Sequence, residues 1–137
     1  MTPFIHKAAL LVVRDGHLLL CRKKRGGALI LPGGKIEQGE TPEQCVKREV
    51  REELGGIKVV RLRLVGSYED VAARLHGEMH RRIRIELFDG ELRGDPRASS
   101  EIAELVWFGP KDDLYGVAPS LRNKIIPDLR ERGLLSA

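Results

Sequence analysis

The sequence predicts an α/β fold in one domain, and three observations support this prediction. The chain has 137 residues, a length that suits a single domain with its own hydrophobic core. Residues 42–54 carry the signals of one amphipathic helix. Segments with strand-like patterns lie both before and after that helix. We therefore expect one domain over residues 1–137, a mixed α/β sandwich with a mostly mixed sheet.

The N-terminal segment predicts a β-hairpin followed by a further strand. Residues 5–13 become rich in strand-forming residues toward their end, and residues 18–23 form the returning strand. Asp15-Gly16 between them is a typical hairpin turn. Residues 26–34 then predict a short apolar strand between two glycine turns.

The central helix has the clearest local signals in the chain. Thr41 is a favourable N-cap, Pro42 suits the first helical position, and Gln44 completes a capping box with Thr41. Apolar residues recur every four positions along one face: Val46, Val50 and Leu54. The glycines at 55–56 end the helix, so we expect it to span residues 42–54.

Strand-like segments continue after the helix. Three of them are expected: 57–69, 79–90 and 104–110. Residues 90–100 are rich in Gly, Pro and Ser and predict a loop. Residues 119–132 predict a closing helix that Pro127 should shorten or kink.

Composition excludes several classes of protein. Hydrophobic residues make up 42% of the chain and charged residues 32%, which is typical of a globular domain rather than a disordered one. The longest apolar run, residues 8–13, is too short to cross a bilayer, and the N-terminus lacks a secretory pattern. We therefore expect a cytoplasmic protein with no membrane partner. Only 4% of residues are aromatic, so a stacking platform for nucleic acid is not expected.

Charge is unevenly distributed along the chain. The net charge is +4, with basic residues gathered at 22–25 and 80–84 and acidic residues gathered at 37–53. This distribution suits the binding of a phosphorylated anion through a bound cation, although plain solubility would also explain it. Cys21 and Cys45 belong to no metal-binding pattern, and we interpret both as small buried hydrophobic residues.

Three carboxylates fall on one face of the expected helix. Glu49, Glu52 and Glu53 have the i, i+3 and i+4 spacing that brings side chains together. Such crowding is costly in a bare protein but suits a hard divalent cation, with Mg²⁺ preferred and Mn²⁺ as a substitute. The alternative is an acidic solvated face that pairs with Arg48 and Arg51.

The residues around these acids resemble the box of the Nudix family, whose pattern is G-x5-E-x7-R-E-U-x-E-E-x-G-U with U a bulky aliphatic residue. Every fixed position of the pattern is matched here, by Gly34, Glu40, Arg48, Glu49, Glu52, Glu53 and Gly55. Gly56 departs from the last aliphatic position, and Ile57 follows one place late. The resemblance implies an α/β/α sandwich with a catalytic box helix. It also implies Mg²⁺-dependent hydrolysis of a nucleoside diphosphate linked to another group X.

The resemblance assigns the metal ligands. It implies that Glu49 and Glu53 bind the ion directly, that the carbonyl of Gly33 adds an oxygen, and that Glu52 acts through water or holds a second ion. Glycine at position 33 would let the backbone approach the ion closely.

The resemblance also gives Arg48 an organising role, in which it pairs with box carboxylates such as Glu40 and keeps them aimed. The alternative is an ion pair on the helix surface that contributes little.

The box pattern does not by itself assign the residue that accepts a proton from water. In many family members it comes from a loop before a strand that contains Trp or Phe, and here residues 99–108 supply Glu101 and Glu104. We expect Glu101 to act, because a loop acid can approach the ions, whereas Glu104 begins the strand. A box glutamate, Glu52 or Glu53, is the rival assignment.

Substrate contacts are expected from two places. One or two of the basic residues at 22–25, with Arg22 and Lys24 as candidates, would bind a substrate phosphate; a solvated basic turn is the alternative. Asn123 is a candidate reader of the base, with a helix cap or polar surface as its alternative.

The resemblance leaves the substrate open. We expect a nucleotide, and first a nucleoside triphosphate cleaved by a MutT-like house-cleaning enzyme. ADP-ribose or a dinucleoside polyphosphate is an alternative substrate, and a non-catalytic nucleotide- or RNA-binding module is an alternative function. An isomerase acting on an isoprenoid diphosphate shares the scaffold but needs a catalytic Cys and Glu that are not evident here. Family members are often dimers, so a homodimer is considered.

Overall fold

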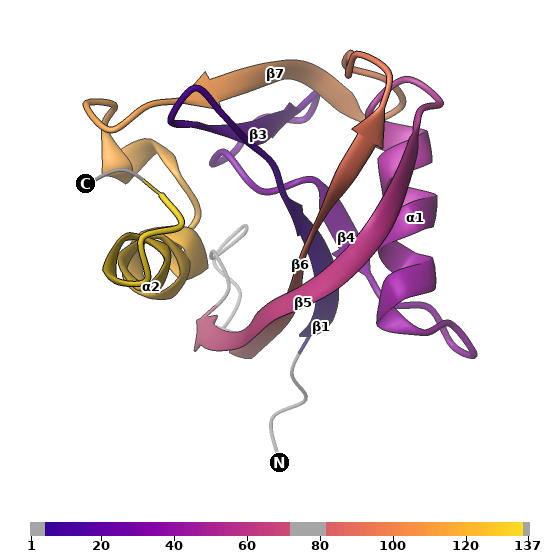
Figure 1. The fold of residues 1–137 in the computed structure, drawn as a ribbon, viewed down its shortest axis with the longest axis horizontal. Helices are drawn as coiled ribbons and strands as arrows, with labels where there is room; N and C mark the ends of the chain where they lie inside the picture. Colours follow the sequence, from indigo (N-terminus) through magenta and orange to yellow (C-terminus); the bar gives the residue numbers. More distant parts are fainter. Residues whose placement is uncertain (1–4, 72–81, 136–137) are drawn as a thin grey trace.

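A four-stranded sheet and a three-stranded sheet form the middle of the molecule, with helices on opposite sides (Figure 1). The computed structural model describes residues 5–71 and 82–135. Its strands are β1 (Ile5–Leu11), β2 (Val13–Arg14), β3 (His17–Lys23), β4 (Gly33–Lys35), β5 (Lys58–Val71), β6 (Arg82–Arg93) and β7 (Ile102–Phe108). Its helices are α1 (Pro42–Glu53), a 3₁₀ turn (Leu114–Gly116), a π-helical segment (Leu121–Ile125) and α2 (Ile126–Glu131).

The larger sheet has the strand order β4-β1-β6-β5, and the smaller has the order β2-β3-β7. Strands β1 and β6 run parallel, while the other pairs in both sheets are antiparallel. Figure 1 shows α1 on one side of this arrangement and α2 on the other. The expected α/β class with a mixed sheet and a helix on each side is therefore confirmed.

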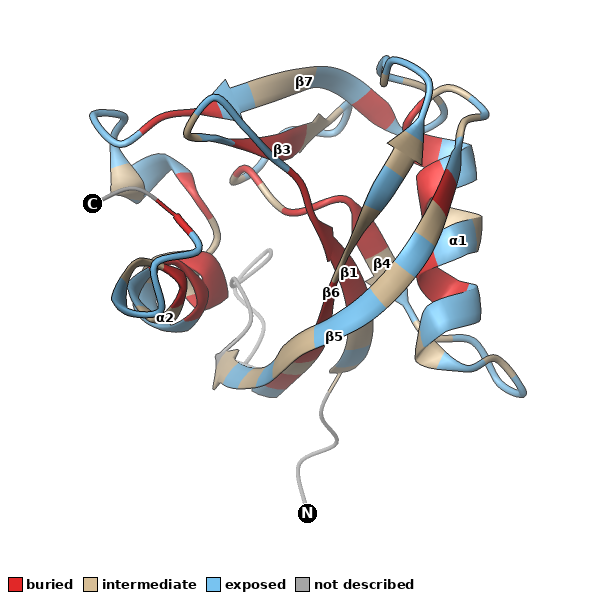
Figure 2. Ribbon diagram, viewed as in Figure 1, coloured by how far each residue is buried: buried red, intermediate tan, exposed pale blue. Residues whose placement is uncertain are grey.

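Strand β1 supplies both hydrophobic cores because successive side chains of a strand point to opposite faces. Ala8 and Leu10 pack with the buried face of α1, whereas Ala9 and Leu11 pack with α2 and the π-helical segment. Figure 2 shows these buried stretches along the inner strands and on the inward faces of both helices. The two cysteines are free and buried, as expected from their apolar surroundings.

Helix α1 begins and ends where the sequence predicts, within one residue. The Thr41 hydroxyl accepts a hydrogen bond from the Gln44 amide at 3.1 Å, and the Gln44 side chain accepts one from the Thr41 amide at 2.9 Å. The stripe of Val46, Val50 and Leu54 is fully buried against the sheet. This packing fixes which face of α1 carries the acidic residues.

The prediction of a strand at 26–34 is wrong. Leu29 and Ile30 form only isolated bridges, and the strand of this region, β4, lies at Gly33–Lys35, where a glycine turn had been expected. A Cβ on Gly33 would lie 2.2 Å from the Ala8 carbonyl oxygen, so only glycine can pair this closely with β1. The pairing depends on contacts with β1, which local propensity does not report.

The closing helix changes from π to α geometry between Ile125 and Ile126, just before Pro127, where the sequence predicted a shortened or kinked helix. The π-helical segment precedes α2, and Pro127 sits in the first turn of α2, where a missing amide hydrogen costs least. Strand β6 extends to Arg93, beyond the expected end at residue 90, and residues 79–81 of the predicted strand lie outside the described residues.

Gly33→Ala should lower the free energy of unfolding by about 2 kcal/mol or more, because the added methyl group overlaps the β1 backbone. Gly39→Ala is the matched control: Gly39 also has a positive φ, but a Cβ there would meet nothing within 4 Å. Denaturant titration of both variants measures the difference. Equal losses would show that positive φ alone, rather than the contact with β1, requires glycine at position 33.

Candidate active site

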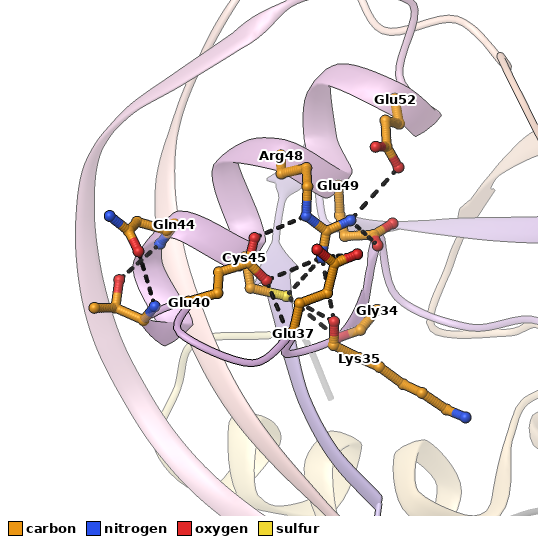
Figure 3. Close-up of polar contacts among 10 residues, drawn as sticks. Gly34, Lys35, Glu37, Glu40, Gln44, Cys45, Arg48, Glu49 and Glu52 are labelled. Atoms are coloured by element: carbon orange, nitrogen blue, oxygen red, sulfur yellow. Dashed lines mark hydrogen bonds and ion pairs between the residues drawn. The ribbon is translucent and has the colours of Figure 1, made fainter.

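Arg48 lies at the centre of the acidic face of α1 (Figure 3). Its Nε and Nη2 atoms donate to the two carboxylate oxygens of Glu40 at 2.7 and 3.0 Å, which is a bidentate pair. Its Nη1 atom donates to Glu49 at 2.7 Å, and Nη2 also donates to the Lys35 carbonyl at 3.2 Å. Arg48 therefore joins the loop before α1, strand β4 and the helix itself.

The Arg48–Glu40 pair changes the titration of both groups. The Arg48 hydrogen bonds, with one from the Glu37 amide, lower the pKa of Glu40 to about 2. The pKa of Arg48 is raised by the same hydrogen bonds to Glu40 and by those to Glu49. Glu40 and Arg48 are therefore both charged across the physiological pH range.

Glu49 packs against the backbone of β4. A Cβ on Gly34 would lie 2.6 Å from the Glu49 carboxylate carbon, so a larger residue there would displace this carboxylate from its present position. The Glu49 side chain is 15% exposed, and burial raises its pKa against the opposing effect of Arg48. The first glycine of the box thus makes space for the carboxylate of its helix.

Glu53 is the buried acid of the site. Its residue is 7% exposed, and its Oε1 atom accepts a hydrogen bond from the Gly33 amide at 2.8 Å. No cation lies within ion-pair distance of it in the described part of the chain. Burial raises the pKa of Glu53 to about 7, so a positive charge placed beside this carboxylate would be strongly favoured.

The three helix carboxylates share a face but do not converge. Glu52 is 52% exposed and lies 3.6 Å from Arg48, while Glu49 turns to Arg48 and Glu53 turns to Gly33. Within residues 5–71 and 82–135, no three His, Cys, Asp or Glu side chains stand close enough to hold a metal ion. The oxygen-only donors on this face nevertheless suit Mg²⁺ or Mn²⁺ better than zinc.

The loop from Gly94 to Glu101 packs on the C-terminal end of α1. The Ser99 amide donates to the Glu53 carbonyl at 3.1 Å, and the Arg97 amide donates to the Leu54 carbonyl at 3.3 Å. Gly55 has a φ of +84°, a conformation that favours glycine, and a Cβ there would lie 2.5 Å from the Arg97 side chain. These contacts hold the loop that carries Glu101 at the C-terminal end of α1.

Glu101 and Glu104 have different surroundings. The Glu101 side chain is exposed and has no hydrogen-bond or ion-pair partner among the described residues, whereas Glu104 accepts from Arg22 Nε at 2.7 Å. Glu104 therefore has its own cation, and Glu101 does not.

The predicted substrate residues lie away from the cavity beside the box. Arg22 pairs with Glu104, the exposed Lys24 donates its amide to the Glu101 carbonyl at 2.8 Å, and neither lines the cavity. The Asn123 amide donates to Asp70 at 3.1 Å on an exposed face. Their roles in substrate binding stay predictions, and the structure gives each of them another contact.

A cavity of about 270 Å³ lies next to Gly33 and Gly34 on the α2 side of the sheet. Its walls are mostly apolar, but four cationic residues also line it: Lys7, Lys23, Arg25 and Lys35. Burial lowers the pKa of Lys7, and the charges of Lys23 and Lys35 lower it further. Lys23 and Arg25 belong to the basic run 22–25 that the sequence analysis considered, whereas Lys7 and Lys35 were missed, although a lysine inside the apolar segment 5–13 was a usable signal.

Replacing Glu53 by Gln should make the metal-free protein more stable at neutral pH. The folded state raises the pKa of Glu53, so the free energy of unfolding falls as pH rises from about 4.5 to about 7 and then stays level. The variant removes this loss, which amounts to about 3 kcal/mol. Denaturant titrations in EDTA at pH 5 and pH 8 measure it.

The advantage of Glu53→Gln over the wild type should be present at pH 8 and small at pH 5. An equal pH dependence in both proteins would contradict the raised pKa. Glu43→Gln, which removes an exposed acid from the first turn of α1, is the matched control.

None of the helices within the described residues is long and apolar enough to cross a bilayer.

Comparison with curated proteins finds relatives with several activities. The chain is 36% identical over 121 residues to the NAD-capped RNA hydrolase NudC of Vibrio vulnificus, covering 86% of this chain but only 43% of that protein. It is 30% identical over 122 residues to the CTP pyrophosphohydrolase of Escherichia coli, covering 85% and 84%. It is 33% identical over 110 residues to the ADP-ribose pyrophosphatase of Methanocaldococcus jannaschii, covering 74% and 64%.

Solved structures give the same picture of the fold. The solution structure of the E. coli ORF135 protein matches with a TM-score of 0.69 and 27% identity, covering 99% of this chain and 96% of that one. A MutT NUDIX hydrolase from Burkholderia pseudomallei matches with a TM-score of 0.64 and 29% identity, covering 81% and 87%. The profile of the NUDIX domain matches residues 4–129. This match covers nearly the whole chain, and the box residues Arg48, Glu49 and Glu53 make the contacts described above. The chain therefore belongs to the Nudix family.

Proposed function

We propose that this protein is a Mg²⁺-dependent pyrophosphohydrolase that cleaves a nucleoside diphosphate linked to X, with a nucleoside triphosphate as the preferred substrate. One observation carries the proposal: a buried carboxylate without a cation, Glu53, lies beside a cavity lined by four cations without a carboxylate. An ion on the acidic side and a polyphosphate on the basic side would satisfy both at once.

The box residues are the proposed metal site. Glu49 and Glu53 would bind the ion directly, the Gly33 carbonyl would add an oxygen, and Glu52 would act through water. Bound there, Mg²⁺ or Mn²⁺ would supply positive charge against the phosphate oxygens. Arg48 would keep Glu40 and Glu49 in place, because its bidentate pair with Glu40 fixes the guanidinium.

The proposed reaction is attack of water on a phosphorus atom of the pyrophosphate group. The new bond joins the water oxygen to phosphorus, the bridging P–O bond breaks, and the released phosphate oxygen carries away the electron pair. A carboxylate must accept the proton of the water. Glu101 is our choice, because its loop is held to the end of α1 and its carboxylate has no other partner among the described residues. Glu52 is the rival, since it is the most exposed of the box acids on α1.

We prefer a triphosphate substrate because of how much of each relative's length this chain matches. The CTP pyrophosphohydrolase of E. coli is matched over 84% of its length, whereas NudC is matched over 43%, so more than half of NudC has no counterpart here. ADP-ribose is the second candidate, because the ADP-ribose pyrophosphatase of M. jannaschii is matched over 64% of its length. A nucleotide panel with Mg²⁺, scored for release of phosphate, pyrophosphate and nucleoside monophosphate, distinguishes these substrates. No release from any member of the panel would favour a non-catalytic binding module.

Glu53→Gln should abolish turnover of the best substrate in that panel while the protein remains folded. Loss of a direct ligand removes the charge that holds the ion, and we expect a fall of at least about 100-fold. Glu43→Gln on the same helix should keep wild-type turnover. Full activity of Glu53→Gln would overturn the ligand assignment.

Glu101→Gln should slow turnover more than Glu104→Gln does. Loss of a proton acceptor typically costs about 10²–10⁴-fold, whereas loss of the surface pair with Arg22 costs little. Steady-state kcat of both variants, measured at equal metal saturation, decides the order. The reverse order would move the proton acceptor to Glu104, and two unaffected variants would leave a box glutamate.

A further inference from the structure

Lys7 is one of the four cationic residues that line the cavity next to Gly33 and Gly34. Strand β1 places Lys7 directly beside Lys35 of β4 and Ile85 of β6. Neighbours in register point to the same face of a sheet, and all three residues line the cavity. The ammonium of Lys7 is therefore on the α2 side, in a half-buried position between two strands.

No carboxylate of the described residues lines this cavity. Its lining includes Lys7, Lys23, Arg25 and Lys35 but no Asp or Glu. None of the four makes an ion pair within the described residues. Like charges directly opposite one another, as in the Lys7–Lys35 pair, destabilise a sheet. An arrangement that costs stability and lacks a partner within the protein suits an anionic ligand.

Position along β1 indicates which part of a ligand Lys7 would meet. Ala9 lies opposite Gly33 of the box. Lys7 lies two residues before Ala9 on the same strand, and Ile5, two residues further on, pairs with Ile83 at the apolar end. A strand rises about 3.3 Å per residue, so Lys7 lies roughly 7 Å beyond the box end of the cavity. The lining also includes Ala118, Pro119 and Leu121, and such apolar walls suit an organic ring rather than a phosphate.

We propose that Lys7 binds the phosphate that remains on the nucleoside after cleavage, with Lys35 as its second cation. The ligand group is a nucleoside 5′-monophosphate, whose nucleoside extends toward Ile5 and Ile83. This inference rests on the proposed function for the direction of the substrate. It adds a specificity-determining residue outside the box, and it predicts that Lys7 discriminates a nucleotide from its nucleoside.

Binding measurements without metal test this role separately from catalysis. Isothermal titration calorimetry in EDTA compares each of AMP, CMP, GMP and UMP with its nucleoside. Wild type should bind at least one monophosphate more tightly than the matching nucleoside. Lys7→Met should weaken that monophosphate at least tenfold and leave the nucleoside unchanged.

Two variants serve as controls. Lys58→Met removes an exposed lysine from β5 and should bind like wild type. Lys7→Gln keeps a polar side chain without the charge and should show the same loss as Lys7→Met, so a folding defect in one variant does not decide the result. Far-UV circular dichroism checks that each variant is folded.

The inference is overturned if Lys7→Met and Lys7→Gln bind the monophosphate like wild type. It is also overturned if they lose nucleoside affinity equally, or if wild type shows no preference for the phosphate. Failure of the proposed function looks different, because the nucleotide panel then shows no Mg²⁺-dependent release while the Lys7 variants still lose the monophosphate.

Discussion

The bidentate pair between Arg48 and Glu40 is the contact on which the acidic face of α1 depends. One guanidinium contacts Glu40 and Glu49 by hydrogen bonds and lies within 3.7 Å of Glu37 and 3.6 Å of Glu52. Without this charge, the same acids would repel one another at the entrance to the site. Because Arg48 also donates to the Lys35 carbonyl, it holds the helix to β4, the strand that separates the acidic face from the cavity.

Glu53 lowers the stability of the metal-free protein at neutral pH. Burial raises its pKa to about 7, so the folded protein without metal loses stability by ionising it at neutral pH. A residue selected for stability alone would be neutral at this position. The cost is consistent with a carboxylate kept for a cation that is bound during function, as expected when an active site is strained relative to the rest of the fold.

Local signals predicted the helix, because capping and periodicity are encoded within a few residues of α1, whereas the box was identified by its resemblance to the family pattern. Strand β4 was misplaced, because its pairing depends on the contact of Gly33 with Ala8 across the sheet. Arg22 and Lys24 were predicted to bind phosphate, but the cavity is lined by Lys23 and Arg25, which alternate with them in sequence. Which set of alternating residues faces inward depends on the pairing of β3 with β7 and on its irregularity after Arg22, neither of which appears in the basic run itself.

The two glycines at 33 and 34 join these features into one site. Gly33 lets β4 lie against β1 and gives its amide to Glu53, while Gly34 leaves room for Glu49. Both residues also line the cavity that holds the four cations. In the proposed site, these two glycines lie between the acids of α1 and the lysines of β1 and β3 that would act on one polyphosphate. A side chain at position 33 would overlap the β1 backbone, and one at position 34 would displace the Glu49 carboxylate, so both glycines affect how β4 packs between α1 and β1.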